Sequence, residues 1–438
     1  MKKTLILWII IIQANVTAQE VLELDMKTKE EIVDSIASVM KEKYFFPDIG
    51  EKMADFINTQ FKNGEYNSFT EVEPFCVQLT TDLRTIIVDK HLWIYYDPEE
   101  SYEILADKNM LPEEEIRKVK ERYHQWHKRQ NYGFQKVEVL KGNIGYLKLN
   151  YFSKLDGAET CAGAMAILAN TDAIIIDLRD NGGGENIGIL LSSYFFTTDR
   201  LLLGTVNFRD STQNETIWTL PYIPGKRMPN TPLYILTSSR TFSAAESFTY
   251  NMQQLKRAVV VGETTKGGAH PIDVFIIKGN ILAQVPIGSS YNPISKTNWE
   301  GTGVIPDVLT TSDQALNAAY VMALDSLIKQ ETDKDIILKL DWEKKGAAYL
   351  SNPLFLNEKT LEQYVGQYGN RIIMIKNNNL FFLPGNQSEY RMIPLEKDLF
   401  MIEGIDYFRI QFDEVINGRA KRLVIMYDDG FKQTSERK

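Results

Sequence analysis

Hydrophobic positions recur at helical spacing through the first part of the chain. Within residues 28–85 apolar side chains fall three or four positions apart, as in Ile32, Ile36 and Met40, and this period predicts amphipathic helices. We expect about three packed helices here. The run 85–96 changes period and is rich in β-branched and aromatic residues, which predicts a strand entered by a tight turn.

Short apolar runs then alternate with helical patterns. Strands are predicted at 143–149, 173–178, 233–236 and 258–261, and helices at 157–168, 186–196 and 243–254. Strands that alternate with helices usually pair in parallel, so the fold class predicted is α/β with a largely parallel central sheet. A further helix is expected from Ser312 to about Gln330.

The pattern changes again near the end of the chain. Charged residues at 331–335 indicate a linker, and short strands separated by turns begin at about Leu361, which predicts a small all-β domain, a barrel or a sandwich. The expected division is a signal peptide at 1–18, an N-terminal helical domain at 19–98, a helical connector at 99–135, an α/β core at 136–330, a linker at 331–360 and a C-terminal β domain at 361–438.

The first eighteen residues have the features of a secretory signal. Lys2 and Lys3 precede an apolar run from Leu5 to Ile12, and small residues at 16–18 form a cleavage site. The eight apolar residues of this run are too few to cross a bilayer, which needs about 20. We therefore expect export to the periplasm or the exterior, with no stable membrane insertion after cleavage.

Composition narrows the classes of partner. Of 438 residues, 44% are apolar and 24% charged, values typical of a soluble globular protein. The 49 Lys and Arg against 58 Asp and Glu give no broad basic surface for a phosphate backbone, so nucleic acid is not an expected partner. Cys76 and Cys161 are the only cysteines. They permit at most one disulfide and supply no metal-ligand pattern, so we expect structural cysteines. We expect neither a metal nor an organic cofactor.

A glycine-rich turn follows the predicted strand 173–178. The sequence Asp177 to Gly184 ends in three glycines, which let the backbone turn tightly and direct its N–H groups toward a bound group. The Lys and hydroxyl residue of a phosphate-binding loop are absent from it. The pattern favours an anion or oxyanion site over a simple strand-to-helix turn.

A serine, Ser243, stands at the start of the helix predicted after the strand 233–236. A serine at a helix start is most often only a cap, but Ser243 is followed by two alanines. Such small neighbours would leave its hydroxyl accessible, and the Ala244 N–H could face a developing oxyanion. The alternative to a cap is therefore a nucleophile. The strand 258–261 also runs into a glycine-rich loop, which ends at His270.

Taken together, the order DLRDNGGG, TSSRTFSAAE, VVGETTKGG and EGTGVIPD across 143–307 resembles the tail-specific or C-terminal processing family of serine peptidases. The resemblance implies a crotonase-like α/β core, of the kind shared with tricorn core proteases and interphotoreceptor retinoid-binding proteins. It also implies that Ser243 is the nucleophile and that the backbone N–H groups of Gly183 and Ala244 form the oxyanion hole.

The resemblance leaves the general base to be decided between two branches. In the processing-protease branch a lysine serves, but Gly268 stands at its position here, which argues against a Ser-Lys dyad. Lys266 is the lower-ranked alternative base; otherwise it is a solvated loop charge. In the tricorn-like branch a D-x-H histidine serves, and Asp89-Lys90-His91 makes His91 the expected base.

The other histidines and the residue that orients His91 are less specified. His124 and His127 are expected on the surface. His270 is expected in a substrate loop or in packing, with a catalytic part as the lower-ranked alternative. Glu300 matches a glutamate that acts in tricorn-like sites through a serine preceding the histidine, a position held here by Lys90. Either Glu300 acts more directly, or Asp89 or a further hydroxyl replaces that serine.

These patterns predict an exported serine peptidase that acts on peptides or proteins through an acyl-enzyme. The region 21–98 resembles the helical domain of the retinoid-binding-protein-like members, and no PDZ-type insertion is visible. The alternative is a non-proteolytic protein that binds an apolar, retinoid-like ligand on the same core. A pure binder has no physical need for the serine, the histidine and the glycine turn together, so the peptidase is preferred.

Overall fold

The computed structural model describes residues 22–438 except 198, 352 and 386–387, so the predicted signal segment lies outside the described residues. The chain divides into two compact units. The first comprises the described part of Met1–Val88 with Leu92–Leu105 and Asp273–Val285. The second comprises Asp89–His91, Ala106–Ile272 and Pro286–Lys438. None of the helices in the described part of the chain is both long and apolar enough to cross a membrane.

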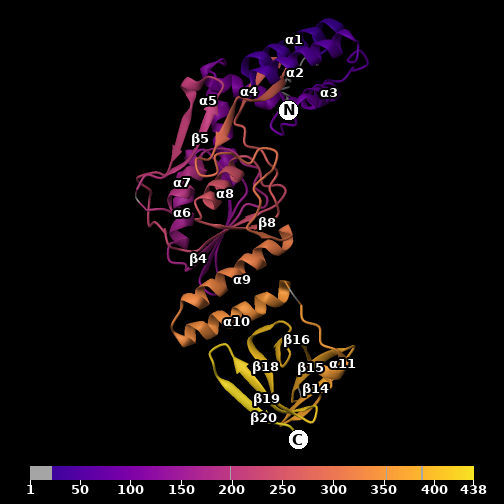
Figure 1. Ribbon diagram of the computed structural model, residues 1–438, viewed down its shortest axis with the longest axis vertical. Helices are drawn as coiled ribbons and strands as arrows, with labels where there is room; N and C mark the ends of the chain where they lie inside the picture. Colours follow the sequence, from indigo (N-terminus) through magenta and orange to yellow (C-terminus); the bar gives the residue numbers. More distant parts are fainter. Residues whose placement is uncertain (1–21, 198, 352, 386–387) are drawn as a thin grey trace, which may run out of the picture. The chain divides into compact units, whose positions relative to one another are not determined.

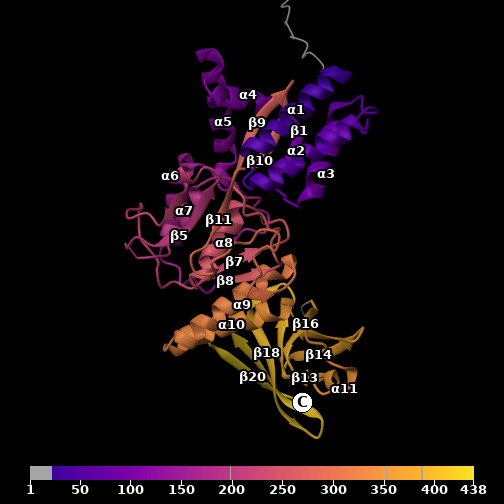
Figure 2. The ribbon, with the colours of Figure 1, turned by 45° about the horizontal axis from the view of Figure 1, so that its top comes forward.

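The first unit contains three helices near its start, a small antiparallel sheet and most of a further helix, α4 (Pro98–Asp107). The first three helices are α1 (Met26–Lys43), α2 (Pro47–Lys62) and α3 (Val72–Ile86), and the sheet has the order β1 (Trp93–Tyr96), β10 (Ile281–Pro286), β9 (Ile272–Lys278). Figure 2 shows β9 and β10 beside the helices, and the apolar face of α1 shares one core with Ile281, Ala283 and Val285.

The strand predicted at 85–96 is shorter than expected. Helix α3 continues to Ile86, and β1 begins only at Trp93. The reason is that Leu79 and Leu83 extend the buried face of α3 at helical spacing. The helices α4 (Pro98–Asp107) and α5 (Glu113–Arg129) follow, and a short 3₁₀ turn, Asn131–Gly133, leads into the second unit's sheet.

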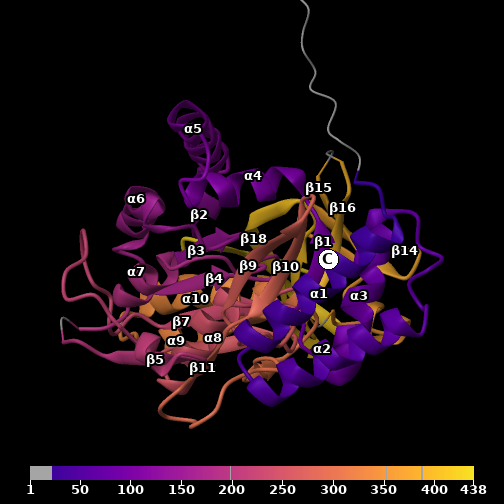
Figure 3. The same ribbon diagram turned by 90° about the horizontal axis from the view of Figure 1, so that it is seen from above.

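A six-stranded sheet forms the centre of the second unit. Its order is β12 (Val308–Leu309), β8 (Val259–Gly262), β7 (Leu233–Thr237), β4 (Ala173–Asp177), β3 (Ile144–Leu149), β2 (Phe134–Leu140). All neighbours are parallel except β2 and β3, and β2, β3, β4 and β7 follow one another in Figure 3. The predicted mixed α/β class is confirmed.

Helices cover both faces of this sheet. Ile174 and Ile176 of β4 belong to the core beneath α6 (Ala158–Leu168), α7 (Ile187–Ser193) and α8 (Ala244–Gln254). Their neighbours Ala173 and Ile175 point to the opposite face and pack in the core that includes α9 (Ser312–Gln330), since successive side chains of a strand alternate. A small sheet not expected from the sequence joins β11 (Gly288–Tyr291), β5 (Leu202–Phe208) and β6 (Glu215–Trp218).

The interval 331–360, predicted as a linker, is not extended. It contains the helix α10 (Lys334–Ser351), which lies alongside α9 in Figure 1. Leu340 and Ala347 are buried, and the Asn317 side chain donates to the Ala347 carbonyl at 2.8 Å. The charges at 331–335 therefore mark the turn between two packed helices.

The C-terminal region forms an eight-stranded antiparallel sheet in which every strand pairs with the next one along the chain. The strands are β13 (Gly366–Tyr368), β14 (Arg371–Lys376), β15 (Asn379–Pro384), β16 (Tyr390–Glu396), β17 (Leu399–Ile402), β18 (Ile405–Ile416), β19 (Arg419–Tyr427) and β20 (Lys432–Glu436), and α11 (Glu358–Leu361) precedes them. A bridge between Tyr368 and Arg437 brings the two ends of the sheet together. The predicted all-β domain is confirmed, as a nearly closed sheet around its own core.

Candidate active site

The three motif-bearing loops begin at one edge of the central sheet. Asp177 at the end of β4 is paired with Leu236 of β7, and Thr237 at the end of β7 is paired with Gly262 of β8. Because the carboxyl ends of parallel strands meet at one edge, the loops that follow them are neighbours. They are also joined by hydrogen bonds: the Phe242 N–H donates to the Asn181 carbonyl at 3.1 Å.

Ser243 has a strained backbone. It is the last residue before α8 and has φ 54° and ψ −120°, a region that residues with a Cβ avoid. A sharp, strained turn between a strand and a helix is the geometry that exposes a nucleophilic serine at the top of a sheet. This strain lowers the stability of the fold, and a serine that acted only as a helix cap would not require it.

The glycine turn lies directly against this serine. A Cβ on Gly183, which has φ +103°, would lie 2.7 Å from the Ser243 Cβ and 3.0 Å from the Ala244 nitrogen. Only glycine leaves room for so close an approach. The structure therefore brings together the predicted nucleophile and the two residues predicted to form the oxyanion hole.

The two predicted oxyanion donors, the N–H groups of Gly183 and Ala244, both lie beside Ser243, but they differ in their hydrogen bonding. The Ala244 N–H is in the first turn of α8, where helix N–H groups have no acceptor within the helix. The Gly183 N–H donates to the side-chain oxygen of buried Asn181 at 2.9 Å, and the Asn181 amide donates to the Leu149 carbonyl at 2.8 Å. A substrate oxygen would have to replace Asn181 as the acceptor for Gly183.

Glu246 links the turn at Ser243 to the glycine-rich loop after β8 by hydrogen bonds. One oxygen of this fully buried carboxylate accepts the N–H groups of Ser243 at 2.9 Å and Gly268 at 2.8 Å, and the other accepts the Gly267 N–H at 2.6 Å and the Thr265 hydroxyl. Burial raises the pKa of Glu246, while these hydrogen bonds oppose the rise. Glu246 belongs to one of the sequence motifs, but the motif alone indicates no role for it.

A cavity of about 300 Å³ adjoins Ser243. Ser243, Ala244 and His270 lie on its wall, which is built mainly from α7, α8 and the small β5–β6–β11 sheet. Its apolar side chains include Ile189, Leu203, Val206, Ile217 and Phe248. Such a cavity can hold an apolar side chain of a ligand.

His91 is buried beside the residue that precedes the serine. Its ring stacks on Phe242 with 4.3 Å between the ring centroids. A Cβ on Gly268 would lie 2.6 Å from the His91 Cε1 atom, so the imidazole occupies space that a side chain at 268 would need. Burial lowers the pKa of His91 to about 4 despite the Asp89 carboxylate nearby, which keeps the ring neutral at neutral pH.

Lys266, the lower-ranked alternative base, is exposed. Its Nζ atom lies 4.5 Å from the centre of the Phe242 ring, a cation–π contact, and its carbonyl accepts a hydrogen bond from the Lys90 ammonium group. Both lysines therefore lie along the outer side of the loop that carries Gly268.

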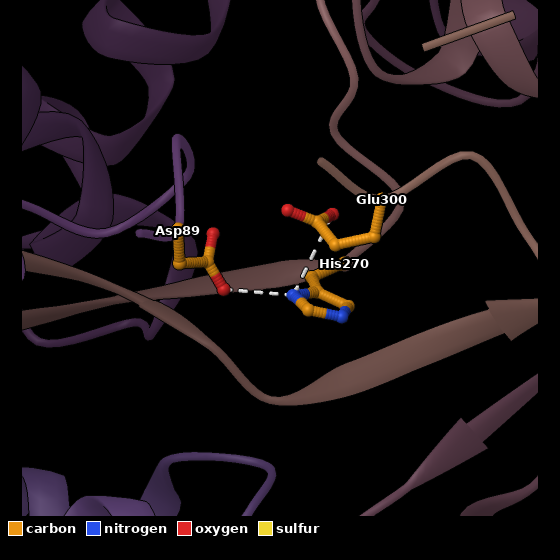
Figure 4. A group of neighbouring side chains, drawn as sticks. All are labelled: Asp89, His270 and Glu300. Carbon is orange, nitrogen blue, oxygen red and sulfur yellow. Dashed lines mark hydrogen bonds and ion pairs between the residues drawn. The ribbon is translucent and has the colours of Figure 1, made fainter. Parts of the chain in front are cut away.

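A group of three charged side chains adjoins the cavity (Figure 4); Asp89 and His270 are buried and Glu300 is partly exposed. His270 Nδ1 lies 2.7 Å from Asp89 Oδ2 and 3.6 Å from Glu300 Oε2. Burial disfavours the charged form of His270, but the hydrogen bond to Asp89 and the charges of Asp89 and Glu300 outweigh it and raise the pKa of His270. Their ligand atoms lie within 4.8 Å of one another, close enough to hold a metal ion, although the hydrogen bond already satisfies one pair.

Glu300, the predicted orienting group for His91, has two close contacts in this group. Its Oε2 accepts the Ala269 N–H at 2.6 Å and faces His270. Burial raises the pKa of Glu300, opposed by the charge of His270. His270 was expected in a substrate loop or in packing, with a catalytic part as the lower-ranked alternative. The sequence offers no signal that a histidine at 270 meets an aspartate at 89.

Two family models match the chain. Residues 143–310 match Peptidase family S41, and residues 12–125 match the N-terminal domain of peptidase S41 in eukaryotic IRBP. The chain carries a peptidase family S41 domain. The resemblance predicted from the motifs is therefore confirmed.

Curated proteins similar to this chain include carboxyl-terminal-processing peptidases. Carboxyl-terminal-processing peptidase 1, chloroplastic, of Arabidopsis thaliana is 26% identical over 40% of this chain and 35% of its own length. The carboxyl-terminal-processing protease of a Picosynechococcus strain is 23% identical over 45% of this chain and 49% of its own length. The matched S41 domain thus spans between a third and a half of these relatives.

Solved structures similar to this chain include a putative peptidase from Parabacteroides merdae and the tricorn protease. The first has a TM-score of 0.45 and 18% identity over 68% of this chain and 98% of that chain. The second has a TM-score of 0.43 and 12% identity over 69% of this chain and 37% of that chain.

Proposed function

We propose that this protein is a serine peptidase in which Ser243 attacks the carbonyl of a peptide bond. The observation that carries the proposal is the strained Ser243 backbone, at the start of α8 and on the wall of a cavity of about 300 Å³. Strain of this kind persists where the surrounding structure fixes it for a function. The finer fold assignment, a crotonase-like core, belongs to the same proposal.

In the proposed mechanism His91 is the general base. A neutral imidazole can accept the Ser243 hydroxyl proton, and the lowered pKa of His91 keeps it neutral. The Gly183 and Ala244 N–H groups stabilise the oxyanion, and water then hydrolyses the acyl-enzyme with His91 again as base. Asp89 holds the backbone at His91 by accepting its N–H at 2.9 Å, with Glu300 supporting from beside His270.

We further propose that the protein is exported and acts on peptide or protein substrates. The proposal for export rests on the signal features of residues 1–18. The intact mass of protein recovered from the native host should correspond to a chain that begins at Gln19. A chain that retains Met1 would contradict export by signal cleavage.

Labelling with a fluorophosphonate tests the nucleophile and its base. The folded wild type should be labelled once, and Ser243→Ala should not be labelled. His91→Gln should be labelled at least about 100-fold more slowly, the lower range for loss of a general base. Ser247→Ala is the matched control, because Ser247 lies on the same cavity wall one helical turn away, and it should be labelled at the wild-type rate.

The other outcomes separate the alternatives. Labelling that survives His91→Gln and disappears with Lys266→Ala would assign the base to Lys266. A folded wild type that takes no label would contradict the peptidase and favour the alternative predicted from the sequence, a protein that binds an apolar ligand.

A further inference from the structure

Asp89 serves two histidines with its two oxygens. One oxygen accepts the His91 backbone N–H at 2.9 Å, and the other contacts His270 Nδ1 at 2.7 Å. Asp89, His91 and His270 are all at least nine-tenths buried. The mechanism proposed above uses only His91, so the second histidine needs an account of its own.

His270 has the position of a group that reaches substrate. It lies on the wall of the same cavity as Ser243 and Ala244. Its Nδ1 atom faces both carboxylates, and Figure 4 shows the other ring nitrogen, Nε2, on the opposite side of the ring. A histidine held by a carboxylate at Nδ1 presents Nε2 for proton transfer, as in a serine-histidine-aspartate triad.

The two histidines sit in opposite electrostatic environments. The charged groups that face His270 are Asp89 and Glu300, which favour its protonated form. The pKa of His91 is lowered to about 4 by burial and, in addition, by His270 and Lys266. Two titratable groups of one site whose pKa values are driven apart in this way are suited to separate acid and base roles.

We propose that His270 is the general acid of this site, protonating the leaving amine through Nε2, while His91 acts as the base toward Ser243. This inference rests on the serine peptidase function proposed above. Asp89 then holds the His91 backbone through one oxygen and the His270 ring through the other, and Glu300 keeps His270 charged.

The proton balance closes over one turnover. In acylation His91 accepts the Ser243 hydroxyl proton, the new C–O bond forms, and His270 gives its proton to the nitrogen as the C–N bond breaks. Before deacylation His91 releases the proton it took from Ser243 to solvent, and His270 takes one up from solvent. In deacylation His91 accepts a proton from the attacking water and gives it to the departing Ser243 oxygen. Both histidines are thereby restored, and no further reactant than water is needed.

An amide and an ester with the same acyl group test this division. An amine must be protonated to leave, whereas p-nitrophenolate leaves as an anion. We expect His270→Gln to lower kcat/KM for an internally quenched peptide by about 100-fold to 10,000-fold, the range for loss of a general acid. Hydrolysis of the p-nitrophenyl ester and fluorophosphonate labelling should each fall less than about 10-fold, a bound chosen well below that range.

Two variants provide the comparison. His91→Gln should slow the amide, the ester and the label alike, and His124→Gln, an exposed histidine on α5, should change none of them. An equal loss on amide and ester in His270→Gln, or no loss on either, would overturn the inference. Because Ser243 would still be labelled in both of those cases, this failure is distinct from a failure of the proposed function.

Wild-type protein supplies a second measurement should His270→Gln not fold. The rate of peptide hydrolysis should fall on the alkaline side as His270 loses its proton, at a pH above the ordinary histidine value of about 6.5. Hydrolysis of the ester should lack that alkaline decline. The same alkaline decline for both substrates would contradict the acid role.

Discussion

The lack of a side chain at position 268 makes room for His91. A Cβ there would lie 2.6 Å from the His91 ring and 2.2 Å from the Phe242 ring, so Gly268→Ala must displace one of them. We expect at least about a 100-fold loss of kcat/KM, because a displaced base cannot reach the Ser243 proton. Overpacking should also lower the free energy of unfolding by about 1–3 kcal/mol.

Gly182→Ala is the control for this change. A Cβ at Gly182 meets nothing within 4 Å, so peptide hydrolysis and thermal unfolding should stay at wild-type values. If Gly268→Ala is labelled by fluorophosphonate at the wild-type rate, His91 is not the base.

The pH dependence of ester hydrolysis reports on His91. Because burial lowers the pKa of His91 to about 4, the neutral base persists well below the ordinary histidine value of about 6.5. Ester kcat/KM should therefore be level through pH 6 and decline only as pH falls toward 4. Stopped-time assays from pH 3.5 to pH 8 would test this, and a decline centred near pH 6.5 would contradict it.

Individual residues differ in how well the sequence predicts them. Ser243, Gly183 and Ala244 belong to local motifs, so their neighbourhood follows once three strands are placed in parallel. The contact of His270 with Asp89 joins residues far apart in the chain, and the engagement of the Gly183 N–H by Asn181 depends on a side-chain conformation. Neither leaves a local pattern.

Glu246 connects two elements, the start of α8 and the glycine-rich loop after β8. In Glu246→Gln one of the two oxygens that accept backbone N–H groups becomes an NH₂ group, which leaves buried donors unsatisfied. This should lower the free energy of unfolding by about 1–3 kcal/mol and slow labelling of Ser243.

Denaturant unfolding followed by circular dichroism would measure the effect. Glu159→Gln replaces an exposed glutamate in the first turn of the neighbouring helix α6, and should change the stability by less than about 0.5 kcal/mol. Equal stabilities for the two variants would mean that Glu246 does not hold the loop.

The strand β6 sets one wall of the cavity. Its Ile217 lines the cavity, whereas Thr216 is exposed, as the alternation along a strand requires. Ile217→Trp should fill the space and reduce the preference for phenylalanine over alanine before the scissile bond by at least about 10-fold, the effect of a few methylenes. Kinetics on peptides that differ only there would show this. Thr216→Trp should leave the preference unchanged, and loss of it in both variants would contradict the assignment.

Helices and strands with a regular spacing of apolar residues could be predicted from the sequence. Those that form because they pack or pair with distant elements could not. All the strands and helices expected between residues 143 and 254 are present, because their apolar runs are buried between two layers. The helix α10 was missed because its sequence is highly charged and only a few positions, such as Leu340, pack against α9. The strands β9 and β10 were missed because the sequence does not show that β10 pairs with β1, far away in the chain, and that β9 lies next to β10.

At the scale of the whole molecule, the first unit depends on a late segment of the chain. Ile281, Ala283 and Val285 are completely buried in its core. A polypeptide of residues 22–105 should therefore lack a cooperative thermal transition, and linking residues 273–285 to its end should restore one. Calorimetry or circular dichroism would show the difference.

The β domain provides the matched case. Residues 354–438 contain a separate core and a nearly closed sheet, so this fragment should unfold cooperatively without additions. A cooperative transition in residues 22–105 alone would contradict the dependence on β10.

The pairing of β1 with β10 joins Trp93 to Gln284, and every proposed catalytic backbone segment from the glycine turn to His270 lies on the chain between them. An exposed stretch at 210–214 interrupts that chain between β5 and β6. Cut there, the protein would become two polypeptides, one carrying Gly183 and the other Ser243. Each polypeptide would contain one strand of the β1–β10 pair and one strand of the β4–β7 pair. Neither would be active alone, so peptidase activity would measure how well the two polypeptides reassociate.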